Sequence, residues 1–301
     1  MPSGGGFSVS DSPSAPGSFT SGAYPQAAAV IGLGVIGGSL ALRLRAASVR
    51  VTGIDIDAQV RAAARARHAV DESSDALAAV ATADLVIIAT PLDRIVETAI
   101  AVAPHLRPGT VLTDTGSVKA PIVAAVEAAL PAGVRFVGGH PIAGSEGQGF
   151  AAADPRLLDG RPFVLTPTSR THPDAVAAMR DLIVRLGMRP VLLDPVQHDE
   201  LAAQISHLPY LVSLALRRAA AGDALAIAGR GFDDMTRIAR SPAAMWDAIC
   251  RSNRAAILRA LASFEGELAR LRRALESDRM GDALPPDTEA AHIISGQRGD
   301  R

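Results

Sequence analysis

Short apolar runs alternate with helical patterns over the first two thirds of the chain. The apolar runs lie at residues 28–31, 49–54, 85–89, 110–113, 136–137, 163–166 and 190–193. Segments with a helical pattern lie between them, among others at 58–67, 74–82, 118–130 and 173–186. Uninterrupted apolar runs are typical of parallel strands that are covered on both faces. The alternation therefore predicts an α/β fold with a doubly wound parallel sheet.

From Pro195 onward the strand-like runs disappear, and alanine- and leucine-rich helical patterns replace them. Helices are predicted at 196–221, 224–228, 232–238, 242–251 and 253–275. The last of them carries an apolar residue at every third or fourth position from Ile257 to Leu275. Such a stripe packs against another helix, which in a small helical domain can belong to a second subunit. The pattern therefore predicts an all-helical C-terminal domain whose last helix packs on a helix of the same chain or of a second subunit.

Composition narrows the class of protein without indicating a reaction. The 301 residues are 48% hydrophobic and 20% charged with a net charge of −1, as expected for a globular protein of about two domains. This balance provides no basic surface for nucleic acid or for an acidic membrane. The single cysteine, Cys250, excludes a disulfide framework and a cysteine-based zinc cluster, and no uncharged apolar run reaches the roughly 18 residues of a membrane span. The first 26 residues lack the features of a secretory signal, so a cytoplasmic protein is expected.

A glycine-rich turn directly follows the first apolar run. It has the G-x-G-x-x-G pattern and consists of Gly32, Leu33, Gly34, Val35, Ile36 and Gly37. Between a strand and a helix, the first glycine permits a tight turn, the second lets a pyrophosphate approach, and the third lets helix and strand pack closely. The helix start adds free N–H groups and a partial positive charge. All six residues are predicted to bind a dinucleotide; the alternative is a structural turn that binds nothing.

Asp55 ends the second apolar run, 18 residues after Gly37. Its carboxylate is expected to accept hydrogen bonds from the adenosine ribose and to repel a 2′-phosphate, which favours NAD over NADP. No arginine follows Asp55 directly. Arg61, inside the next helix, is the nearest side chain that could receive such a phosphate.

These elements divide the chain into four parts. Residues 1–26 are predicted to be disordered, 27–193 to form a Rossmann-type NAD-binding domain, 194–276 to form a helical substrate and dimerisation domain, and 277–301 to form a disordered tail. In an open parallel sheet, ligands bind beyond the carboxyl ends of the strands. Thr90 and Pro91 end one such strand and are expected to line the cofactor site.

His140 is the candidate catalytic residue. It follows a strand and precedes Pro141, which keeps its backbone extended. A neutral imidazole near pH 7 can accept a proton from a hydroxyl while hydride leaves the same carbon. Ser117, one strand away, is expected to bond the substrate oxygen or to orient His140. The alternatives are a loop hydrogen bond for His140, a helix N-cap for Ser117 and a solvated first-turn position for Lys119.

The helical domain adds three polar candidates, His198, His207 and Arg237. His207 lies in a helical stretch broken by a proline, and a proline kink can present polar groups. Arg237 has apolar neighbours and is expected to need an anion. That anion is either a substrate carboxylate in a bidentate pair or an internal partner, Asp233 or Asp234.

Several of these stretches together resemble the prephenate/arogenate dehydrogenase family of tyrosine biosynthesis. The resemblance spans roughly residues 27 to 276 and is carried by 30–39, 114–119, 139–146, 206–209 and 231–246. The glycine turn is shared by many dehydrogenases. The stretches around Ser117 and His140 are far more diagnostic.

The resemblance implies oxidative decarboxylation of prephenate to 4-hydroxyphenylpyruvate, with NAD as the hydride acceptor. His140 would accept the proton of the C4 hydroxyl, and Ser117 would position that hydroxyl. Arg237 would bind a substrate carboxylate, and the helical domain would form a homodimer. Three further residues would complete the substrate site: His207, Tyr210 and Gly144.

One departure from the family pattern leaves the substrate open. Many members that use prephenate have a second histidine at the position of Tyr210, so arogenate, with an amino group in place of the keto group, is an alternative substrate. A hydroxyacid or imine dehydrogenase of the same two-domain plan is a further alternative. Enzymes of that kind usually rely on a lysine in the helical domain, whereas the only lysine here is Lys119. A non-catalytic NAD-binding module, which would require neither His140 nor Arg237, is the remaining alternative.

Overall fold

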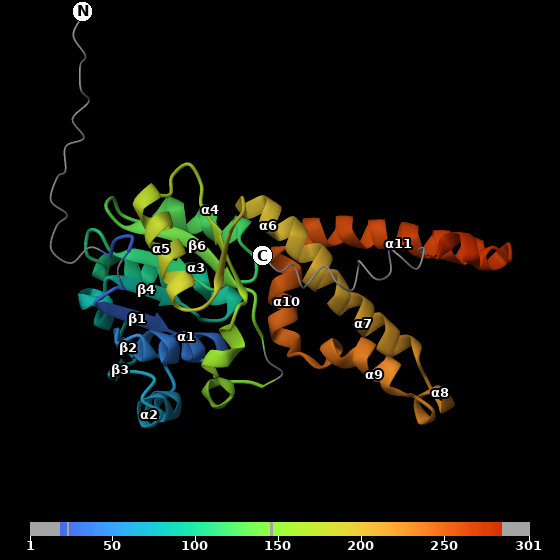
Figure 1. Ribbon diagram of the computed structural model, residues 1–301, viewed down its shortest axis with the longest axis horizontal. Coiled ribbons are helices and arrows are strands. Elements are labelled where there is room, and N and C mark those ends of the chain that lie inside the picture. The colour runs from blue at the N-terminus through green and yellow to red at the C-terminus, as the bar shows by residue number, and fades with distance from the viewer. Residues whose placement is uncertain (1–18, 23, 145–146, 285–301) are drawn as a thin grey trace, which may run out of the picture.

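The computed structural model describes residues 19–22, 24–144 and 147–284. Its central element is an eight-stranded sheet with the order β3-β2-β1-β4-β5-β6-β7-β8 (Figure 1). The strands are β1 (Ala27–Ile31), β2 (Arg50–Ile54), β3 (Glu72–Ser74), β4 (Leu85–Ile88), β5 (Val111–Asp114), β6 (Arg135–Pro141), β7 (Pro162–Thr166) and β8 (Arg189–Leu192). The inner strands β1 and β4 are buried along their whole length, as their apolar runs predict.

The first six strands run parallel, but the last two run in the opposite direction. β6 pairs antiparallel with β7, with Gly139 opposite Leu165, and β7 pairs parallel with β8. The expectation of a fully parallel sheet is therefore wrong at this edge. Among its described residues, the β6–β7 connection holds two 3-10 turns, η4 (Phe150–Ala152) and η5 (Pro155–Leu158), and no α-helix. A parallel partner for β6 would need such a crossover helix, so β7 returns beside β6 in reverse.

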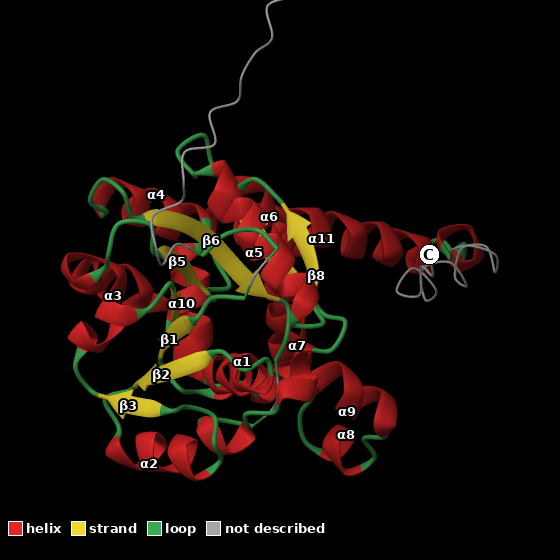
Figure 2. Ribbon diagram, turned by 60° about the vertical axis from the view of Figure 1, so that its left-hand side comes forward, coloured by secondary structure: helices red, strands yellow, loops and turns green. Residues whose placement is uncertain are grey.

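Helices cover both faces of this sheet (Figure 2). They are α1 (Val35–Ala46), α2 (Ala58–Ala66), α3 (Ile95–Val102), α4 (Ala120–Ala129) and α5 (Pro173–Arg185). Leu40 of α1 and Met179 of α5 belong to the core on one face, and Ile95 of α3 and Ile122 of α4 belong to the core on the other. Each face thus has its own core, which explains why the strands are apolar on both sides.

Beyond β8 the chain is helical and extends away from the sheet in two arms (Figure 1). Its helices are α6 (Pro195–Ala202), α7 (Leu208–Ala219), α8 (Asp223–Ala226), α9 (Arg230–Thr236), α10 (Ala243–Ser252) and α11 (Arg254–Glu276). One arm is α11, and the other consists of α7, α8 and α9. No helix in the described part of the chain is long and apolar enough to span a membrane.

The single helix expected at 196–221 is instead α6 and α7 with a π-helical turn, Ala203–His207, between them. Pro209 is the second residue of α7 and has no N–H to donate to the carbonyl four residues earlier. The chain accommodates this with a wider turn. Such π turns are rare and are frequent at functional sites.

Two more expectations differ from the structure. Ser74, expected to begin a helix, is the last residue of β3, and only 77–82 are helical, as a 3-10 turn. β3 contains no apolar residue and lies at the sheet edge, so no apolar run marks it. Near the N-terminus Phe19 is buried in the core and Ser21 hydrogen-bonds to Asp181 of α5, although disorder is expected up to residue 26. Residues 1–18 and 285–301 lie outside the described residues.

Candidate active site

The glycine turn lies at the carboxyl end of β1, against the end of β4. Gly32 has a φ of +91°, and a Cβ on it would lie 2.6 Å from the carbonyl oxygen of Ala89. A Cβ on Gly37 would lie 1.9 Å from the carbonyl oxygen of Gly32, so both positions require glycine. At Gly34, by contrast, no atom lies within 4 Å of the corresponding point. The first and third glycines therefore build the turn, and the second faces open space in which a ligand fits.

The start of α1 is open to an anion. Gly34 is its N-cap, no side chain caps it, and its first turn carries no acidic residue. The N–H groups of Val35, Ile36 and Gly37 consequently lack an acceptor within the helix. Free N–H groups together with the positive end of the helix dipole make this a phosphate site.

Asp55 follows β2 at the same edge of the sheet. Its carboxylate accepts the N–H of Leu33 at 2.8 Å and a second N–H two residues later at 2.9 Å, which holds it beside the glycine turn. Arg61 reaches back to the carbonyl oxygen of Asp55 at 2.7 Å. At the end of β4, before Pro91, the hydroxyl of Thr90 is buried and has no hydrogen-bond partner among the described residues. Room for a phosphate, a carboxylate for a ribose and an unpaired buried hydroxyl fit a dinucleotide such as NAD.

A buried ion pair joins the carboxyl ends of β5 and β6. Asp114, the last residue of β5, pairs with Lys119, and both side chains are fully buried. Asp114 also accepts two backbone N–H groups at 2.9 and 3.1 Å, and the Lys119 ammonium donates to the carbonyl oxygen of Gly139 at 2.7 Å. The alternative of a solvated Lys119 in the first turn of the helix is therefore wrong. Burial lowers the pKa of this ammonium, and Asp114 opposes the shift. The pair ties the loop of Ser117 to the strand of His140.

His140 lies inside β6 rather than after it, one residue before the end of the strand. Its Nδ1 lies 2.8 Å from Nε2 of His198, which belongs to α6. Burial, followed by the nearby His198, Lys119 and His207, lowers the pKa of His140 well below its ordinary value. The imidazole is therefore neutral at pH 7 and is available as a proton acceptor.

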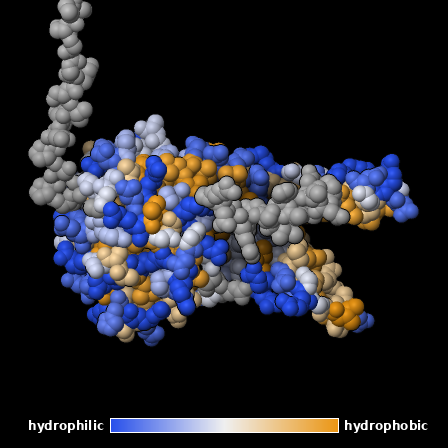
Figure 3. Space-filling view, viewed as in Figure 1, coloured by the Kyte–Doolittle hydropathy of each residue, from blue (hydrophilic) through white to orange (hydrophobic). Residues whose placement is uncertain are grey.

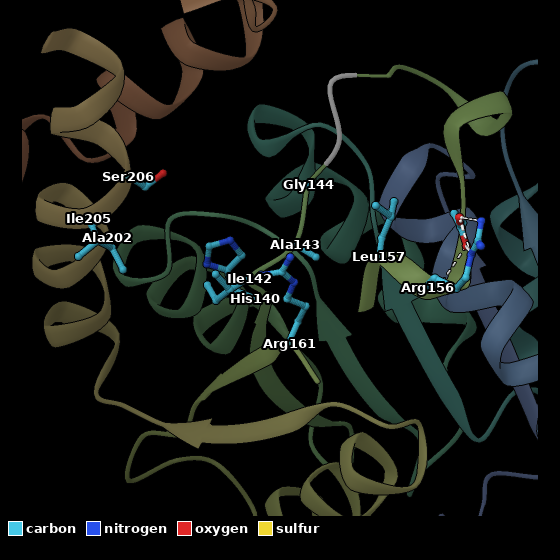
Figure 4. A pocket seen from close by; sticks show the side chains of 11 residues that line it. His140, Ile142, Ala143, Gly144, Arg156, Leu157, Arg161, Ala202, Ile205 and Ser206 are labelled. Carbon is cyan, nitrogen blue, oxygen red and sulfur yellow. Dashed lines mark hydrogen bonds and ion pairs between the residues drawn. The ribbon is translucent and has the colours of Figure 1, made fainter. Parts of the chain in front are cut away.

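A pocket of about 750 Å³ opens beside His140 (Figure 4). Gly144 lines it directly after β6, Ser206 lines it from the π turn, and Arg161 lines it from the start of β7. Figure 4 shows Ser206 on the helical side and His140 between it and the loop that carries Gly144. The pocket thus lies where the sheet and the helical part meet. Ser145 and Glu146, the next residues of this loop, lie outside the described residues.

Ser117 lies in the loop between β5 and α4 and is not a helix cap. α4 begins at Ala120, its N-cap is Lys119, and no side chain of its own caps it. Ser117 is partly exposed, and within the described ranges no side chain or backbone group hydrogen-bonds to its hydroxyl. The hydroxyl therefore keeps its donor and its acceptors for a ligand.

His207 ends the π turn and is 1% exposed. Its Nδ1 lies 3.2 Å from Nδ2 of Asn253, which also donates to the carbonyl oxygen of Asp199 at 2.7 Å. Because this amide nitrogen is a donor, the proton of a neutral His207 is on Nε2. Burial lowers the pKa of His207 to about 4, so at pH 7 it is a neutral hydrogen-bond donor.

Tyr210 and Trp246 connect the helical part to the sheet. Their rings stack with centroids 3.8 Å apart and planes 5° apart. The same cluster contains Val118, from the loop that follows β5, and Ile238, the residue after Arg237. Arg237 itself begins the 3-10 turn η7 (Arg237–Arg240) and is exposed. The side chain of Arg237 is therefore not part of this apolar cluster.

Of the two acids that could pair with Arg237, Asp233 lies 3.9 Å from Arg240. The structure thus assigns Asp233 a different cation. Among the described residues, no group of three or more histidine, cysteine, aspartate or glutamate side chains could hold a metal ion.

Sequence reasoning does not single out the residues behind the two histidines, which are Asp199, Asn253 and Trp246. The one local sign is the dipeptide His198–Asp199 on a single predicted helix. α6 contacts the loop after β5 through Asp199 and β6 through His198, and these contacts between distant segments leave no mark in the apolar pattern.

Two family models match the chain. Residues 39–192 match the nucleotide-binding domain of prephenate dehydrogenase, and residues 194–284 match its dimerization domain. The first match begins just after the glycine turn, and together the two matches include His140, Ser117 and every helix from α2 to α11.

Curated proteins and solved structures agree with these matches. The chain is 33% identical over 265 residues to the prephenate dehydrogenase of Bacillus subtilis, covering 82% of this chain and 69% of that one. It is 34% identical over 266 residues to the cyclohexadienyl dehydrogenase of Zymomonas mobilis, covering 85% and 90%. The prephenate dehydrogenase from Aquifex aeolicus in complex with hydroxyphenyl propionate and NAD+ has a TM-score of 0.82 at 28% identity, covering 92% and 98%. Synechocystis arogenate dehydrogenase has a TM-score of 0.77 at 31% identity, covering 90% and 98%.

Proposed function

The chain belongs to the prephenate dehydrogenase family, and we propose that it oxidises prephenate with NAD and releases the ring carboxylate as carbon dioxide. The product is 4-hydroxyphenylpyruvate, a precursor of tyrosine. The observation that carries this proposal is a neutral imidazole beside a pocket, at the carboxyl edge of a dinucleotide-binding sheet.

NAD supplies the acceptor for the hydride that leaves C4 of the substrate. The turn from Gly32 to Gly37 and the start of α1 hold its pyrophosphate. Asp55 accepts hydrogen bonds from the ribose hydroxyls, and Thr90 and Pro91 line the site at the end of β4. The unpaired hydroxyl of Thr90 and the open space at Gly34 support this assignment.

His140 accepts the proton of the C4 hydroxyl as the C4–H bond breaks. The electrons of the bond between C1 and the departing carboxylate complete the aromatic ring. Loss of a hydride and of carbon dioxide removes no proton overall, so the proton taken by His140 returns to the phenol oxygen. Ser117, whose hydroxyl is free of other described partners, bonds the same oxygen and positions it.

The helical part binds the rest of the substrate in this proposal. Arg237 pairs with a substrate carboxylate, since a guanidinium can hold both oxygens at once. His207 donates a second hydrogen bond from its Nε2, and the ring of Tyr210 packs beside the substrate. Gly144 leaves room in the pocket wall, because no atom lies within 4 Å of the point where a Cβ would be.

Arogenate is the second candidate substrate. Tyr210 stands where many prephenate-using relatives have a histidine, and two similar proteins are named as a cyclohexadienyl dehydrogenase and an arogenate dehydrogenase. The two substrates share the ring, the C4 hydroxyl and both carboxylates. His140, Ser117 and Arg237 therefore serve either substrate, and only the side chain that carries the keto or amino group distinguishes them.

A second copy of the chain completes the helical part, and the protein acts as a homodimer. Along α11 the side chains of Leu258, Leu268 and Leu275 are exposed. Figure 3 shows pale to orange surface over the arm of α7, α8 and α9. Apolar surface on isolated arms of this kind is typical of a subunit interface. Because the reaction draws on NAD, a cytoplasmic location is expected.

Steady-state assays of the purified protein test the proposed function. Prephenate and arogenate are each supplied with NAD and with NADP, NADH or NADPH formation is followed by absorbance, and the products are identified. We expect the highest kcat/KM for prephenate with NAD, with 4-hydroxyphenylpyruvate as the product. Faster conversion of arogenate to tyrosine would make arogenate the substrate. Absence of turnover with both compounds would overturn the proposed function.

A further inference from the structure

A chain of hydrogen bonds runs from His140 into the protein, away from the pocket. Nδ1 of His140 lies 2.8 Å from Nε2 of His198, and Nδ1 of His198 lies 2.8 Å from Oδ1 of Asp199. His198 is 2% exposed and Asp199 is 5% exposed. Water therefore has little access to these two side chains. Their hydrogen-bond partners in the protein determine which atom carries each proton.

The start of α4 donates two backbone hydrogen bonds to the side chain of Asp199. The backbone N–H of Lys119 donates to its Oδ1 at 2.6 Å, and that of Ala120 donates to its Oδ2 at 2.9 Å. α4 has no cap of its own, so Asp199 caps it from another helix. Both carboxylate oxygens of Asp199 therefore accept a backbone N–H, and the Lys119 ammonium lies nearby.

The contacts of Asp199 determine which ring nitrogen of each histidine carries the proton. An ionised Asp199 can only accept, so the Nδ1 of His198 carries a proton. In neutral His198, Nε2 then has a lone pair and can only accept. The Nδ1 of His140 must therefore carry the proton of that ring, which leaves Nε2 of His140 with its lone pair.

We infer that His198 and Asp199 are positioning residues that hold His140 in the tautomer whose Nε2 accepts the substrate proton. This inference deepens the proposed function and rests on it. A neutral imidazole with no such partner can carry its proton on either nitrogen, and the form with the proton on Nε2 cannot act as a base. The hydrogen bonds from Asp199 through His198 also fix the plane of the His140 ring, as an acid behind a histidine does in other proton-transfer sites.

Three further titratable groups lie around these hydrogen-bonded residues. Lys119, from the loop before α4, is paired with Asp114 of β5 and helps to keep His140 neutral. His207, from the π turn, has a pKa of about 4 and is neutral at pH 7. None of these three groups takes the place of His198 as the hydrogen-bond partner of Nδ1 of His140.

Paired substitutions at His198 separate positioning from packing. Glutamine has a terminal oxygen that can accept the Nδ1–H of His140, whereas leucine is of similar size and cannot accept. We expect His198→Leu to lower kcat about 100-fold with the KM for NAD unchanged, and His198→Gln to keep kcat within about 10-fold of the parent. His105→Leu, at an exposed histidine between α3 and β5, is the control for loss of an imidazole.

The tautomers can be read without any substrate. Nitrogen-15 NMR of the full-length protein with labelled histidine should show both His140 and His198 protonated at Nδ1 near pH 7, each assigned by its loss in the His140→Asn or His198→Leu variant. This readout separates the two proposals, because a protein that oxidises neither substrate still reveals its tautomers. His140 protonated at Nε2 would overturn the inference even if His198→Leu failed to fold. Equal kcat for the leucine and glutamine variants would overturn it as well.

Discussion

The sheet part of the molecule is complete by itself, whereas the helical part is not. Residues 27–192 form two cores, one on each face of the sheet, and their helices bury their apolar sides within the same chain. By contrast, the 23-residue helix α11 buries only Ala256, Ile257 and Ala260. Its other apolar side chains are exposed or only partly buried in the single chain. The difference teaches that the sheet part buries its apolar surface within one chain, whereas α11 leaves most of its apolar side chains for a second copy to cover.

The candidate active site lies on the border between these two regions. The sheet supplies His140 and Ser117, and the helical part supplies Arg237, His207 and the partner of His140, His198. If this division is right, changes on the sheet side should affect the chemical step. Changes on the helical side, apart from those at His198, should affect substrate binding and assembly.

The largest effect is expected at His140. His140→Asn removes the proton acceptor, so kcat should fall by about 10²–10⁴-fold, the usual scale for a lost general base. The affinity for NAD should not change, because the glycine turn and Asp55 are untouched. Steady-state kinetics and NAD titration measure the two quantities, with His105→Asn as the control. A variant with unchanged kcat would remove His140 from the mechanism.

Arg237 should affect binding rather than the chemical step. Arg237→Gln loses a charged hydrogen bond worth about 1.5–3 kcal/mol, so the KM for prephenate should rise by roughly 10- to 100-fold with kcat little altered. Initial rates over a range of prephenate concentrations, with NAD saturating, provide the test. An unaltered KM would make Arg237 a structural residue.

The incompleteness of the helical part can be tested on α11. Leu268→Glu places a charge in the exposed apolar stripe, and loss of one buried leucine is worth about 1.5–3 kcal/mol. The dimer dissociation constant should rise roughly 10- to 100-fold, as measured by light scattering over a range of concentrations. NAD binding to the sheet part should persist.

Ser263→Glu is the matched control for this substitution, since it adds the same charge to another face of α11. Both residues are exposed in the single chain. If the two variants dissociate equally, or if neither does, the stripe is not the interface.

Acid should lower the free energy of unfolding through His207, which lies at the border between the two regions. The pKa of His207 is about 4 in the folded protein, below the ordinary value of 6.5, so the unfolded chain binds more protons between these two pH values. The free energy of unfolding should therefore be undiminished above pH 6.5 and fall as pH drops towards 4, by about 1.4 kcal/mol per pH unit from this group. Urea midpoints at a fixed protein concentration measure the slope. His207→Leu should flatten it, and an equal slope would contradict a buried neutral His207.

The strands could be predicted from the sequence wherever burial on both faces leaves an uninterrupted apolar run. β1 and β4 are such cases, and the glycine turn could be predicted because its geometry demands glycine at Gly32 and Gly37. β3 could not, because its three residues are polar and lie at the sheet edge. The family resemblance predicts that His140 and Ser117 belong to one site. The structure pairs β5, which precedes Ser117, with β6, which carries His140.

The rest depends on contacts between distant segments. The apolar runs of β7 and β8 are the same for either strand direction, so nothing in them predicts that these two strands are reversed. The contact of α6 with His140 is not predicted by them either. The burial of Lys119 depends on Asp114, and the role of Asp199 depends on the uncapped start of α4. The sequence points to His140 as the candidate catalytic residue, but only the packing of three elements reveals what holds it.

The most direct test of the central claim follows the hydrogen at C4. Prephenate carrying deuterium at C4 and carbon-13 in the ring carboxylate is incubated with NAD and the enzyme, and the products are analysed by mass spectrometry. The account predicts one deuterium in each reduced cofactor and one labelled carbon dioxide for each 4-hydroxyphenylpyruvate formed. Unlabelled reduced cofactor, or reduction without release of labelled carbon dioxide, would contradict it.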